Sequence, residues 1–388
     1  MEAQSPHLWG SKDSSVTSDT SDISSVSTTG SDASGITRRG LLKGAAAGAA
    51  SLGALGGGLL STGTAAAATQ KTTTPAVVEF PRGGQLREYW FQANSFFHNI
   101  VPTGIDGQTG NTFSPTQTSF WAIGYQAFTP GWGKPLPGND DIGPNTGIPG
   151  PILRGQVGDT IRVHFRNNDT YYKAAHSISP HAVRGTPEMD GGWSWMLRDR
   201  PGTAVNVGET YTYEWTVIPR SVGTWPYHDH SKDFDPGRGV SVMEAGAELG
   251  LIGMLAITDQ NTPQVDTEIT TLWHSFYSSD IPGLSQDFHC LDGYAYLGNT
   301  PIKRAKVGQR VRWRVVSLGN DFHTFHIHAH TWSYAGEFTD CVVIGPGVGH
   351  SFEYVEDNPG TWYYHCHVPM HVMGPGMGGM IGLYTVSS

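Results

Sequence analysis

Alternation between apolar and polar residues, with a period of two, marks the chain from about residue 75 onward. It is clearest in four segments: 157–169 (VGDTIRVHFRNND), 208–218 (GETYTYEWTVI), 306–321 (KVGQRVRWRVVSLGND) and 350–355 (HSFEYV). Because successive side chains of a β-strand point to opposite faces, this pattern predicts half-buried strands and an all-β fold. The segment 105–150 is rich in Gly, Pro, Asn and Asp, which predicts a long loop or insertion.

The predicted strands recur in the same order in both halves of the chain. GPILRGQVGDTIRVHFRNND followed by HSISPH matches TPIKRAKVGQRVRWRVVSLGND followed by HTFHIH. VGTWPYHDH matches PGTWYYHCH, and LGLIGMLAITD matches GGMIGLYTVSS. The repeat predicts two homologous domains at 75–258 and 271–388, joined by a linker at 259–270. Each domain has the length and strand pattern of a Greek-key β-sandwich or barrel.

The first 68 residues are expected to lie outside both domains. Residues 1–36 are rich in Ser, Thr and Asp, a composition that cannot form a core. Arg38 and Arg39 then precede an Ala/Gly/Leu run that ends in small residues near 65–68, which resembles a twin-arginine export signal. Gly, Ser and Thr make the run too polar for a stable membrane anchor. We therefore expect a mature chain from about residue 69 that is secreted or works in the cell envelope.

The charge and cysteine content exclude some classes of partner and scaffold. The net charge is −10 and no basic patch occurs, so nucleic acid is not an expected partner. Three cysteines are too few for a disulfide framework, although an exported location leaves a bridge between Cys290 and Cys341 open. The chain also has seventeen histidines, many of them in short clusters at 176–181, 228–230, 323–330 and 365–371.

The cluster YYHCHVPMHVMGPGM at 363–377 carries the strongest chemical signal. In a strand, Cys366 faces one way while His365 and His367 face the other, so consecutive residues can serve two metal centres. One thiolate, two imidazoles and a distant axial methionine form the blue-copper ligand set. Cys366, His371 and Met377 supply three of these ligands, and His323 is the natural second imidazole.

The same parity divides the other histidines. In HTFHIHAH, His326 and His328 share a face, while His323 lies at odd spacing from both and can face the cysteine side. His228 and His230 also share a face, on either side of Asp229. The pattern predicts a blue-copper set and a separate cluster of imidazoles.

HTFHIH together with HCHVPMH resembles the motifs of the multicopper oxidases, above all the two-domain, laccase-like members, over residues 150–388. The resemblance implies cupredoxin-like domains, up to four copper ions per chain, and a trimer in which neighbouring subunits share a copper cluster. It implies type-1 copper at His323, Cys366, His371 and Met377. It implies type-3 copper at His181, His228, His230, His328, His365 and His367, and type-2 copper at His326 and the residue at position 179.

Several positions depart from that family pattern. Ser179 stands where the family has a histidine, and a hydroxyl is a poor copper ligand. His176 matches His323 but lacks a cysteine partner, because the first domain has Asp229 there. His176 is interpreted as a relic or a satisfied polar residue, unless a bulge at Pro180 turns it inward.

Two further positions leave a choice open. Met377 lies one residue farther from Cys366 than is usual in the family, which leaves Met373 and Met380 as alternative axial ligands. Asp190 is either a proton donor to reduced oxygen or a solvated turn residue.

The predicted function is an exported oxidase. It would couple one-electron oxidation of a phenol, an aromatic amine or a metal ion to four-electron reduction of dioxygen to water, with the type-2 site in doubt at Ser179. The alternatives are a copper nitrite-reductase-like enzyme and a blue-copper electron carrier without enzymatic activity. The reducing substrate is not predicted.

Overall fold

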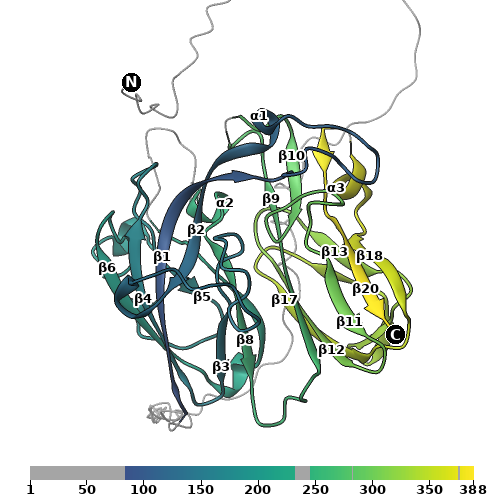
Figure 1. Ribbon diagram of the computed structural model, residues 1–388. Helices are drawn as coiled ribbons and strands as arrows, with labels where there is room; N and C mark the ends of the chain where they lie inside the picture. The colour runs from purple at the N-terminus through teal and green to yellow at the C-terminus, as the bar shows by residue number, and fades with distance from the viewer. Residues whose placement is uncertain (1–83, 232–244, 282, 375) are drawn as a thin grey trace, which may run out of the picture. The chain divides into compact units, whose positions relative to one another are not determined.

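The computed structural model describes residues 84–231, 245–281, 283–374 and 376–388 (Figure 1). The predicted leader at 1–68 and its twin-arginine signal lie outside the described residues, so export stays a prediction. Among the helices that are described, none is long and apolar enough to cross a membrane.

The first domain is built from two four-stranded sheets, in blue to teal in Figure 1. One sheet has the order β2-β1-β4-β6, formed by Ser119–Phe128, Leu86–Asn99, Thr160–Asn168 and Thr210–Thr216. The other has the order β3-β8-β7-β5, formed by Leu153–Gln156, Ile252–Thr258, Gly223–His228 and Ser179–Pro180.

The second domain is built from two five-stranded sheets, in green to yellow in Figure 1. One has the order β17-β12-β9-β10-β19, formed by Gly349–Val355, Arg310–Ser317, Thr267–Phe276, Asp287–Leu291 and Met377–Gly378. The other has the order β11-β20-β18-β13-β16, formed by Lys303–Lys306, Ile381–Ser387, Gly360–Cys366, His323–Ile327 and Cys341–Ile344. A hairpin joins β14 (Trp332–Tyr334) to β15 (Glu337–Thr339).

In the described part of the chain, helical structure is confined to short connections. The described α-helices are α1 (Pro115–Thr118), α2 (Ala245–Glu248) and α3 (Pro369–Met373). Single 3₁₀ turns are η1 (Pro130–Trp132), η2 (Pro187–Met189), η3 (Trp195–Leu197) and η4 (Pro219–Ser221). The predicted all-β architecture with two sandwich domains is therefore confirmed.

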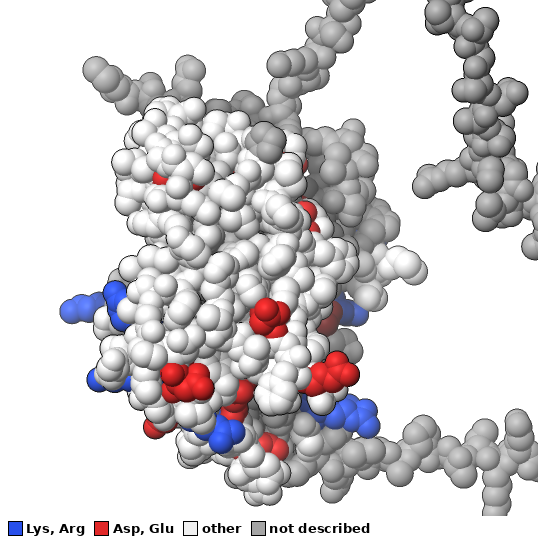
Figure 2. All heavy atoms as spheres, turned by 90° about the vertical axis from the view of Figure 1, so that its right-hand side faces the viewer, with Lys and Arg blue, Asp and Glu red and all other residues white. Residues whose placement is uncertain are grey.

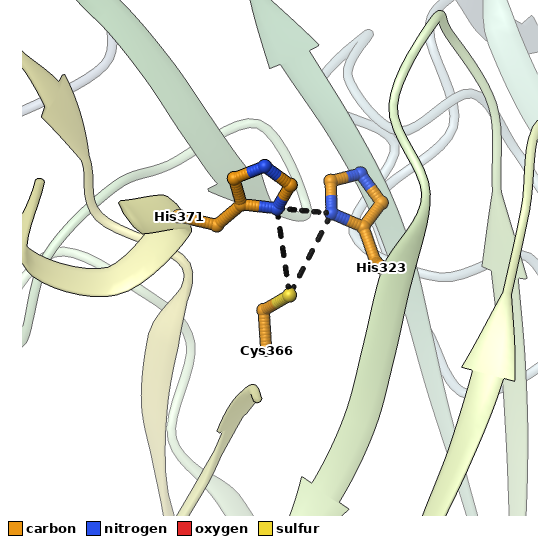
Figure 3. A group of neighbouring side chains, drawn as sticks. All are labelled: His323, Cys366 and His371. Atoms are coloured by element: carbon orange, nitrogen blue, oxygen red, sulfur yellow. Dashed lines mark hydrogen bonds between the residues drawn. The ribbon is translucent and has the colours of Figure 1, made fainter. Parts of the chain in front are cut away.

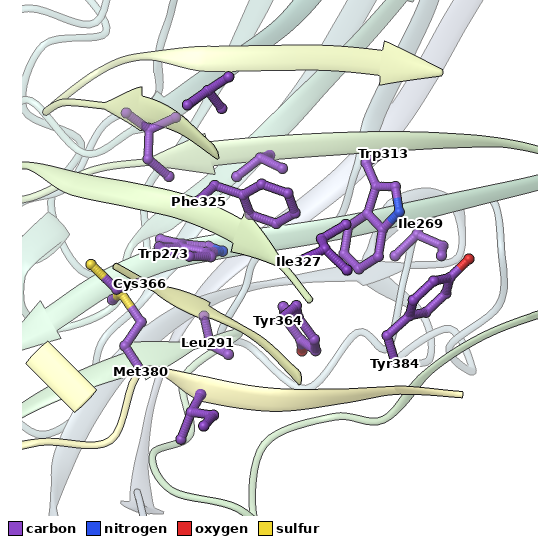
Figure 4. Close-up of a cluster of buried hydrophobic side chains, with 14 of the residues drawn as sticks. Ile269, Trp273, Leu291, Trp313, Phe325, Ile327, Tyr364, Cys366, Met380 and Tyr384 are labelled. Atoms are coloured by element: carbon purple, nitrogen blue, oxygen red, sulfur yellow. The ribbon is translucent and has the colours of Figure 1, made fainter. Parts of the chain in front are cut away.

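Each domain encloses its own aromatic core between its two sheets. In the second domain Trp273, Trp313, Phe325 and Tyr364 are fully buried, and Cys366 lies at the end of the same cluster (Figure 4). The strand β4 shows how the sequence produces this packing, because its residues alternate strictly between buried and half-buried positions. The period of two read from the sequence is thus the period of burial.

A buried ionic contact joins the two domains. The carboxylate of Glu268 on β9 lies 2.6 Å from Arg154 Nη1 of the first domain and 2.7 Å from Arg314 Nε on β12. Burial raises the pKa of Glu268, but the positive charges of Arg314 and Arg154 outweigh it and hold that pKa below its ordinary value. Arg314 Nη1 also donates to Thr224 Oγ1 on β7, at 3.0 Å. The contact therefore ties β9 and β12 to the edge of the first domain.

Two expectations about the chain's organisation are wrong. The composition of 105–150 predicts a loop, but β2 runs through this segment and pairs antiparallel with β1. Both faces of β2 are buried, with Ile123 and Tyr125 in the first-domain core and Phe120 in a separate apolar cluster. A strand buried on both faces shows no alternation, so its pattern does not stand out among the turn residues. The linker expected at 259–270 is shorter, because β9 already begins at Thr267.

Candidate metal centres

Strands β13 and β18 place the predicted ligands on two opposite faces of one sheet. On β13, His323 and Phe325 are buried, whereas His326 is half-buried on the other side. On β18, Cys366 is buried, while His365 before it is only half-buried. The antiparallel register sets Phe325 opposite Cys366 and His326 opposite His365. The sheet therefore has a thiol side and an imidazole side, as strand parity predicts.

Three ligand atoms converge on the thiol side (Figure 3). His323 Nδ1 and His371 Nδ1 lie 3.1 Å apart, and Cys366 Sγ lies 3.8 Å from the first and 3.5 Å from the second. His323 comes from β13, Cys366 from β18 and His371 from the short helix α3. Two ring nitrogens and a sulfur directed at one point form a donor set that suits a soft or borderline metal ion.

The electrostatics of the thiol side favour neutral imidazoles. Burial, together with the positive charges of His371 and His289, lowers the pKa of His323 to about 3. Burial, followed by the charge of His289, lowers the pKa of His371 to about 4. Burial raises the pKa of the Cys366 thiol, although a bond from Thr324 N at 3.4 Å opposes this rise. Binding of a metal ion would therefore displace a proton from Cys366 only.

A second layer of polar residues supports His371, and the sequence does not reveal it. The ring of His289 on β10 stacks on the ring of His371, with centroids 4.0 Å apart and an interplanar angle of 21°. Ser275 Oγ and Asp321 Oδ2 lie 2.7 Å and 3.3 Å from His289 Nδ1, and the hydroxyl of Tyr277 donates to Asp321. These residues lie on three separate segments with no shared motif, so no sequence signal connects them.

Four histidines gather on the imidazole side of the same sheet. His328 Nε2 and His365 Nε2 approach to 3.0 Å, and the His326 ring lies 5.2–5.3 Å from the rings of His328, His365 and His367. His326 Nδ1 and His365 Nδ1 each face a backbone carbonyl at 2.8 Å. Donation to those carbonyls leaves each Nε2 with a lone pair for a metal ion.

The first domain carries a smaller imidazole group of its own. His181 Nε2 and His228 Nε2 lie 3.3 Å apart, and the His228 and His230 rings lie 5.7 Å apart. His228 Nδ1 faces the Asp229 carbonyl at 2.9 Å, which repeats the bond of His365. Among the described residues, each group of three or more ligand atoms within 4.8 Å of one another belongs to the second domain. No such group therefore combines histidines of both domains of one chain.

The two domains share the same strand pairing and backbone hydrogen bonds around their histidine clusters, and this likeness locates Ser179. Ser179 pairs with His228 as His326 pairs with His365. The backbone N–H of His181 donates to Pro226, as that of His328 donates to Tyr363. Ser179 thus occupies the position of His326 in the other domain, and it places a hydroxyl where the second domain has an imidazole.

His176 is excluded as a metal ligand by its neighbours. Its ring is completely buried, with Nδ1 2.8 Å from Asp229 Oδ2 and Nε2 3.3 Å from Asp169 Oδ2. Burial alone would lower the pKa of His176, but the two carboxylates raise it to about 9. Both nitrogens therefore carry protons, so the interpretation of His176 as a satisfied polar residue fits this geometry, and a bulge at Pro180 does not turn it inward.

The three methionines considered as axial ligands differ sharply in burial. Met380 is fully buried and packs in one cluster with Cys366 (Figure 4), whereas Met377 is half-buried and Met373 is 57% exposed. The carbonyl of Met380 accepts a bond from Cys366 N at 3.1 Å, and its N–H donates to the His371 carbonyl at 3.0 Å. Met380 is thus bonded to two of the three ligands, which favours it over Met377.

Exposure and hydrogen bonding describe the remaining residues singled out in the sequence. The side chain of Asp190 is 58% exposed, lies 3.4 Å from Arg200 and borders Gly192, as His230 does. Cys290 and Cys341 are free thiols, so the bridge left open between them is not formed. His330 lies between the His328 carbonyl at 2.7 Å and Glu356 at 3.0 Å, which makes it a structural residue.

Comparisons with known proteins agree with this arrangement. Two family profiles, both described as multicopper oxidase, match residues 134–262 and 262–383. Ferroxidase HEPHL1 of Mus musculus is 29% identical over 79% of this chain, and the chain spans 29% of that relative. A multicopper oxidase crystal structure has a TM-score of 0.56 at 20% identity, covering 78% of this chain and 89% of its own. A copper nitrite reductase from Nitrosomonas europaea has a TM-score of 0.52 at 17% identity, covering 78% and 94%. Both structures share the cupredoxin fold predicted here.

The contrast between the methionines gives a direct test. If Met380 is the axial ligand of a metal held by His323, Cys366 and His371, Met380→Leu should shift the reduction potential and the blue absorption of the copper-loaded protein. Met377→Leu is the matched control and should leave both unchanged. Redox titration followed by absorption measures the two variants, and a shift confined to Met377→Leu would contradict the assignment.

Proposed function

The chain belongs to the multicopper oxidase family, which binds copper, and we propose that it oxidises a small reducing substrate by one-electron steps and reduces dioxygen to water. The observation that carries this proposal is the sequence His365-Cys366-His367, which begins on the last two residues of β18 and ends just after it. Its thiol lies with His323 and His371, its first imidazole lies with His326 and His328, and the ring of its second imidazole lies 5.2 Å from that of His326. Few covalent bonds therefore separate the point where electrons enter from the point where dioxygen would be reduced.

The chain's own residues divide into two sets of copper ligands under this proposal. His323, Cys366, His371 and Met380 or Met377 would hold type-1 copper, and His326 with position 179 would hold type-2 copper. The type-3 ligands would be His181, His228, His230, His328, His365 and His367. Copper supplies the one-electron redox couples when bound. The backbone carbonyls that fix the ring tautomers keep the ligand nitrogens unprotonated and correctly turned.

Protons for the reduction of dioxygen would come from the first domain. Asp190 is solvent-exposed, so it can exchange protons with water, and it borders the same glycine as His230. A carboxylic acid at the rim of the imidazole group can donate protons to reduced oxygen at each cycle. Arg200, 3.4 Å away, would hold the carboxylate in place between donations.

The surface around His371 favours an aromatic electron donor. Phe322, Met370 and Met373 are 69%, 43% and 57% exposed and flank the type-1 ligands in the sequence. Figure 1 places α3 at the upper end of the second domain, and Figure 2 shows the described Lys and Arg side chains only in the lower part of that side. An apolar surface with few charges suits a phenol or an aromatic amine, which can stack near the ring of His371.

A metal ion is a second candidate donor. Asp321 keeps a partly exposed carboxylate, and its oxygen lies within 4.8 Å of ligand atoms of His289 and His371. Burial raises the pKa of Asp321, but bonds from His289, Tyr277 and Ser275 outweigh it and hold that pKa far below its ordinary value. A partly exposed carboxylate beside the type-1 ligands can bind a ferrous ion, and a ferroxidase is among the relatives of this chain.

We further propose that the copper cluster forms between subunits. Among the described residues, no group of three or more ligand atoms within 4.8 Å of one another combines the two domains of one chain. A second copy can complete each group, because closed rings of identical chains place one face against the other. Three chains per particle are the expected state, as in the two-domain members that the sequence resembles.

Oxygen consumption tests the oxidase directly. We expect copper-loaded protein to take up oxygen with a phenol, or with ferrous ion, as the only donor, and the faster donor identifies the substrate class. Cys366→Ser removes the thiolate and should reduce uptake to the rate without enzyme. Cys290→Ala is the matched control, because Cys290 is buried in a different apolar cluster and should retain uptake. Equal uptake by wild type and Cys366→Ser would contradict the proposal.

Assembly is tested by sedimentation together with copper content. We expect particles of three chains with up to four coppers per chain. Two coppers per chain would favour the nitrite-reductase-like alternative, and one per chain with no turnover would favour the electron carrier. A monomer that holds the full copper content would contradict a cluster between subunits.

The gap at Ser179 predicts a weak type-2 site. During dialysis against a chelator, we expect wild-type protein to lose the type-2 paramagnetic signal before its blue colour, because a hydroxyl is a poor ligand for cupric ion. Ser179→His should bind the type-2 copper about 10- to 100-fold more tightly and should therefore retain the signal longer. His326→Ala should abolish the signal in both backgrounds. Faster loss from Ser179→His than from wild type would show that Ser179 is not the missing ligand.

A further inference from the structure

The first domain contains an ion pair at the position where the second domain has its type-1 ligands. His176 corresponds to His323 in the repeat, and Asp229 corresponds to Cys366. His176 Nδ1 and Asp229 Oδ2 lie 2.8 Å apart, and both side chains are at least 99% buried. In the second domain, His323 Nδ1 and Cys366 Sγ lie 3.8 Å apart. The first domain thus has a short imidazole–carboxylate contact where the second has a longer imidazole–thiol contact.

The backbone around the two positions is the same. Ser177 N donates to Asp229 Oδ1 at 2.8 Å, as Thr324 N donates to Cys366 Sγ at 3.4 Å. Asp229 N donates to the Leu251 carbonyl, as Cys366 N donates to that of Met380. Leu251 is fully buried and stands where the second domain has the buried methionine. The first domain therefore retains the framework of a type-1 site with a carboxylate and an apolar residue in place of its sulfur ligands.

The carboxylate of Asp229 also connects the two segments that carry the first-domain ligands. It accepts bonds from Ser177 Oγ at 3.2 Å and from the N–H and hydroxyl of Ser231, both at 3.1 Å. Ser177 Oγ in turn accepts a bond from His230 N at 3.1 Å. Asp229 lies between two of the ligands, and Ser177 lies four residues before the third, His181. One buried carboxylate therefore links the backbones of both ligand segments.

We propose that the His176–Asp229 pair, called the clasp below, holds His181, His228 and His230 in position without a metal ion. In the second domain, copper bound by His323 and Cys366 would have this positioning role. The first-domain half of the copper cluster is thus preformed in the metal-free chain. The second-domain half has only the longer imidazole–thiol contact at this place, so we expect bound copper to stabilise it more than the first-domain half. Asp169 completes the clasp, because its carboxylate lies 3.3 Å from His176 Nε2 and accepts N–H bonds from Tyr172 and Ala174 at 3.0 Å. The clasp rests on the proposed function in so far as these histidines bind copper.

Hydrogen exchange of metal-free wild-type protein tests the asymmetry without any substitution. Peptides covering 176–181 and 228–231 should exchange at least about tenfold more slowly than peptides covering 323–328 and 365–371. Addition of copper should slow the second pair much more than the first. Equal exchange in the two domains before copper, with equal slowing afterwards, would overturn the clasp.

Removal of the carboxylate tests its role in positioning. Asp229→Ala should weaken copper binding at the first-domain histidines by about 10- to 100-fold while the blue absorption remains, and Asp229→Asn should retain more of this copper. Asp159→Ala is the matched control. Asp159 is an equally buried carboxylate of the same domain that accepts bonds from Gln85 N, Gln156 N and Arg87, with no link to the ligand segments. Equal copper content in Asp229→Ala and Asp159→Ala would overturn the proposal.

A third variant separates the clasp from the proposed function. His228→Ala removes a proposed ligand directly and is measured in the same copper assay. If His228→Ala holds as much copper as wild type, the proposed function fails, and the exchange data alone decide on the clasp. If His228→Ala loses copper and Asp229→Ala does not, the clasp fails and the proposed function stands.

Discussion

Opposite facing of neighbouring residues on β18 is the constraint on which the site depends. Because Cys366 points into the core, His365 must point to the other side of the sheet, and the ring of His367 just after the strand stacks on that of His365. The register with β13 then brings His326 opposite His365 and Phe325 opposite Cys366. A slip of one residue would move the thiol to the imidazole side and separate it from the ring of His371. The two ligand groups are therefore held together by the pleat of two hydrogen-bonded strands.

Duplication of one domain explains both the likeness and the asymmetry of the two halves. The same backbone bonds recur around Ser179 and His326, and around Asp229 and Cys366, so the framework tolerates different side chains at the same positions. In the first domain, the buried position that corresponds to His323 and Cys366 is occupied by the ion pair of His176 and Asp229. A buried charge is stable only where a partner and hydrogen bonds compensate it. Asp229 has both a partner and hydrogen bonds, so its carboxylate can be buried in the core without destabilising the fold.

The features that the sequence predicts correctly are those that depend on local spacing. Histidine clusters with a cysteine between two of them, read with a period of two, are sufficient to assign Cys366 and His365 to opposite faces of one strand. Met380 cannot be selected in this way, because its nearness to Cys366 arises from pairing between β18 and β20. Likewise β2 carries no alternation, since apolar clusters cover both of its faces. Such features depend on which segments pack together.

The sequence by itself determined the two repeats, the all-β class, and the serine at 179 where the repeat has His326. Each follows from residue identity at short spacing, where strand geometry leaves one outcome. Only the tertiary structure decided that His289 stacks on His371, that Asp229 holds His176, and that no described group of three close ligand atoms combines the two domains. These contacts join residues far apart in the chain, and their geometry is set by sheet pairing and domain packing, which local spacing does not specify.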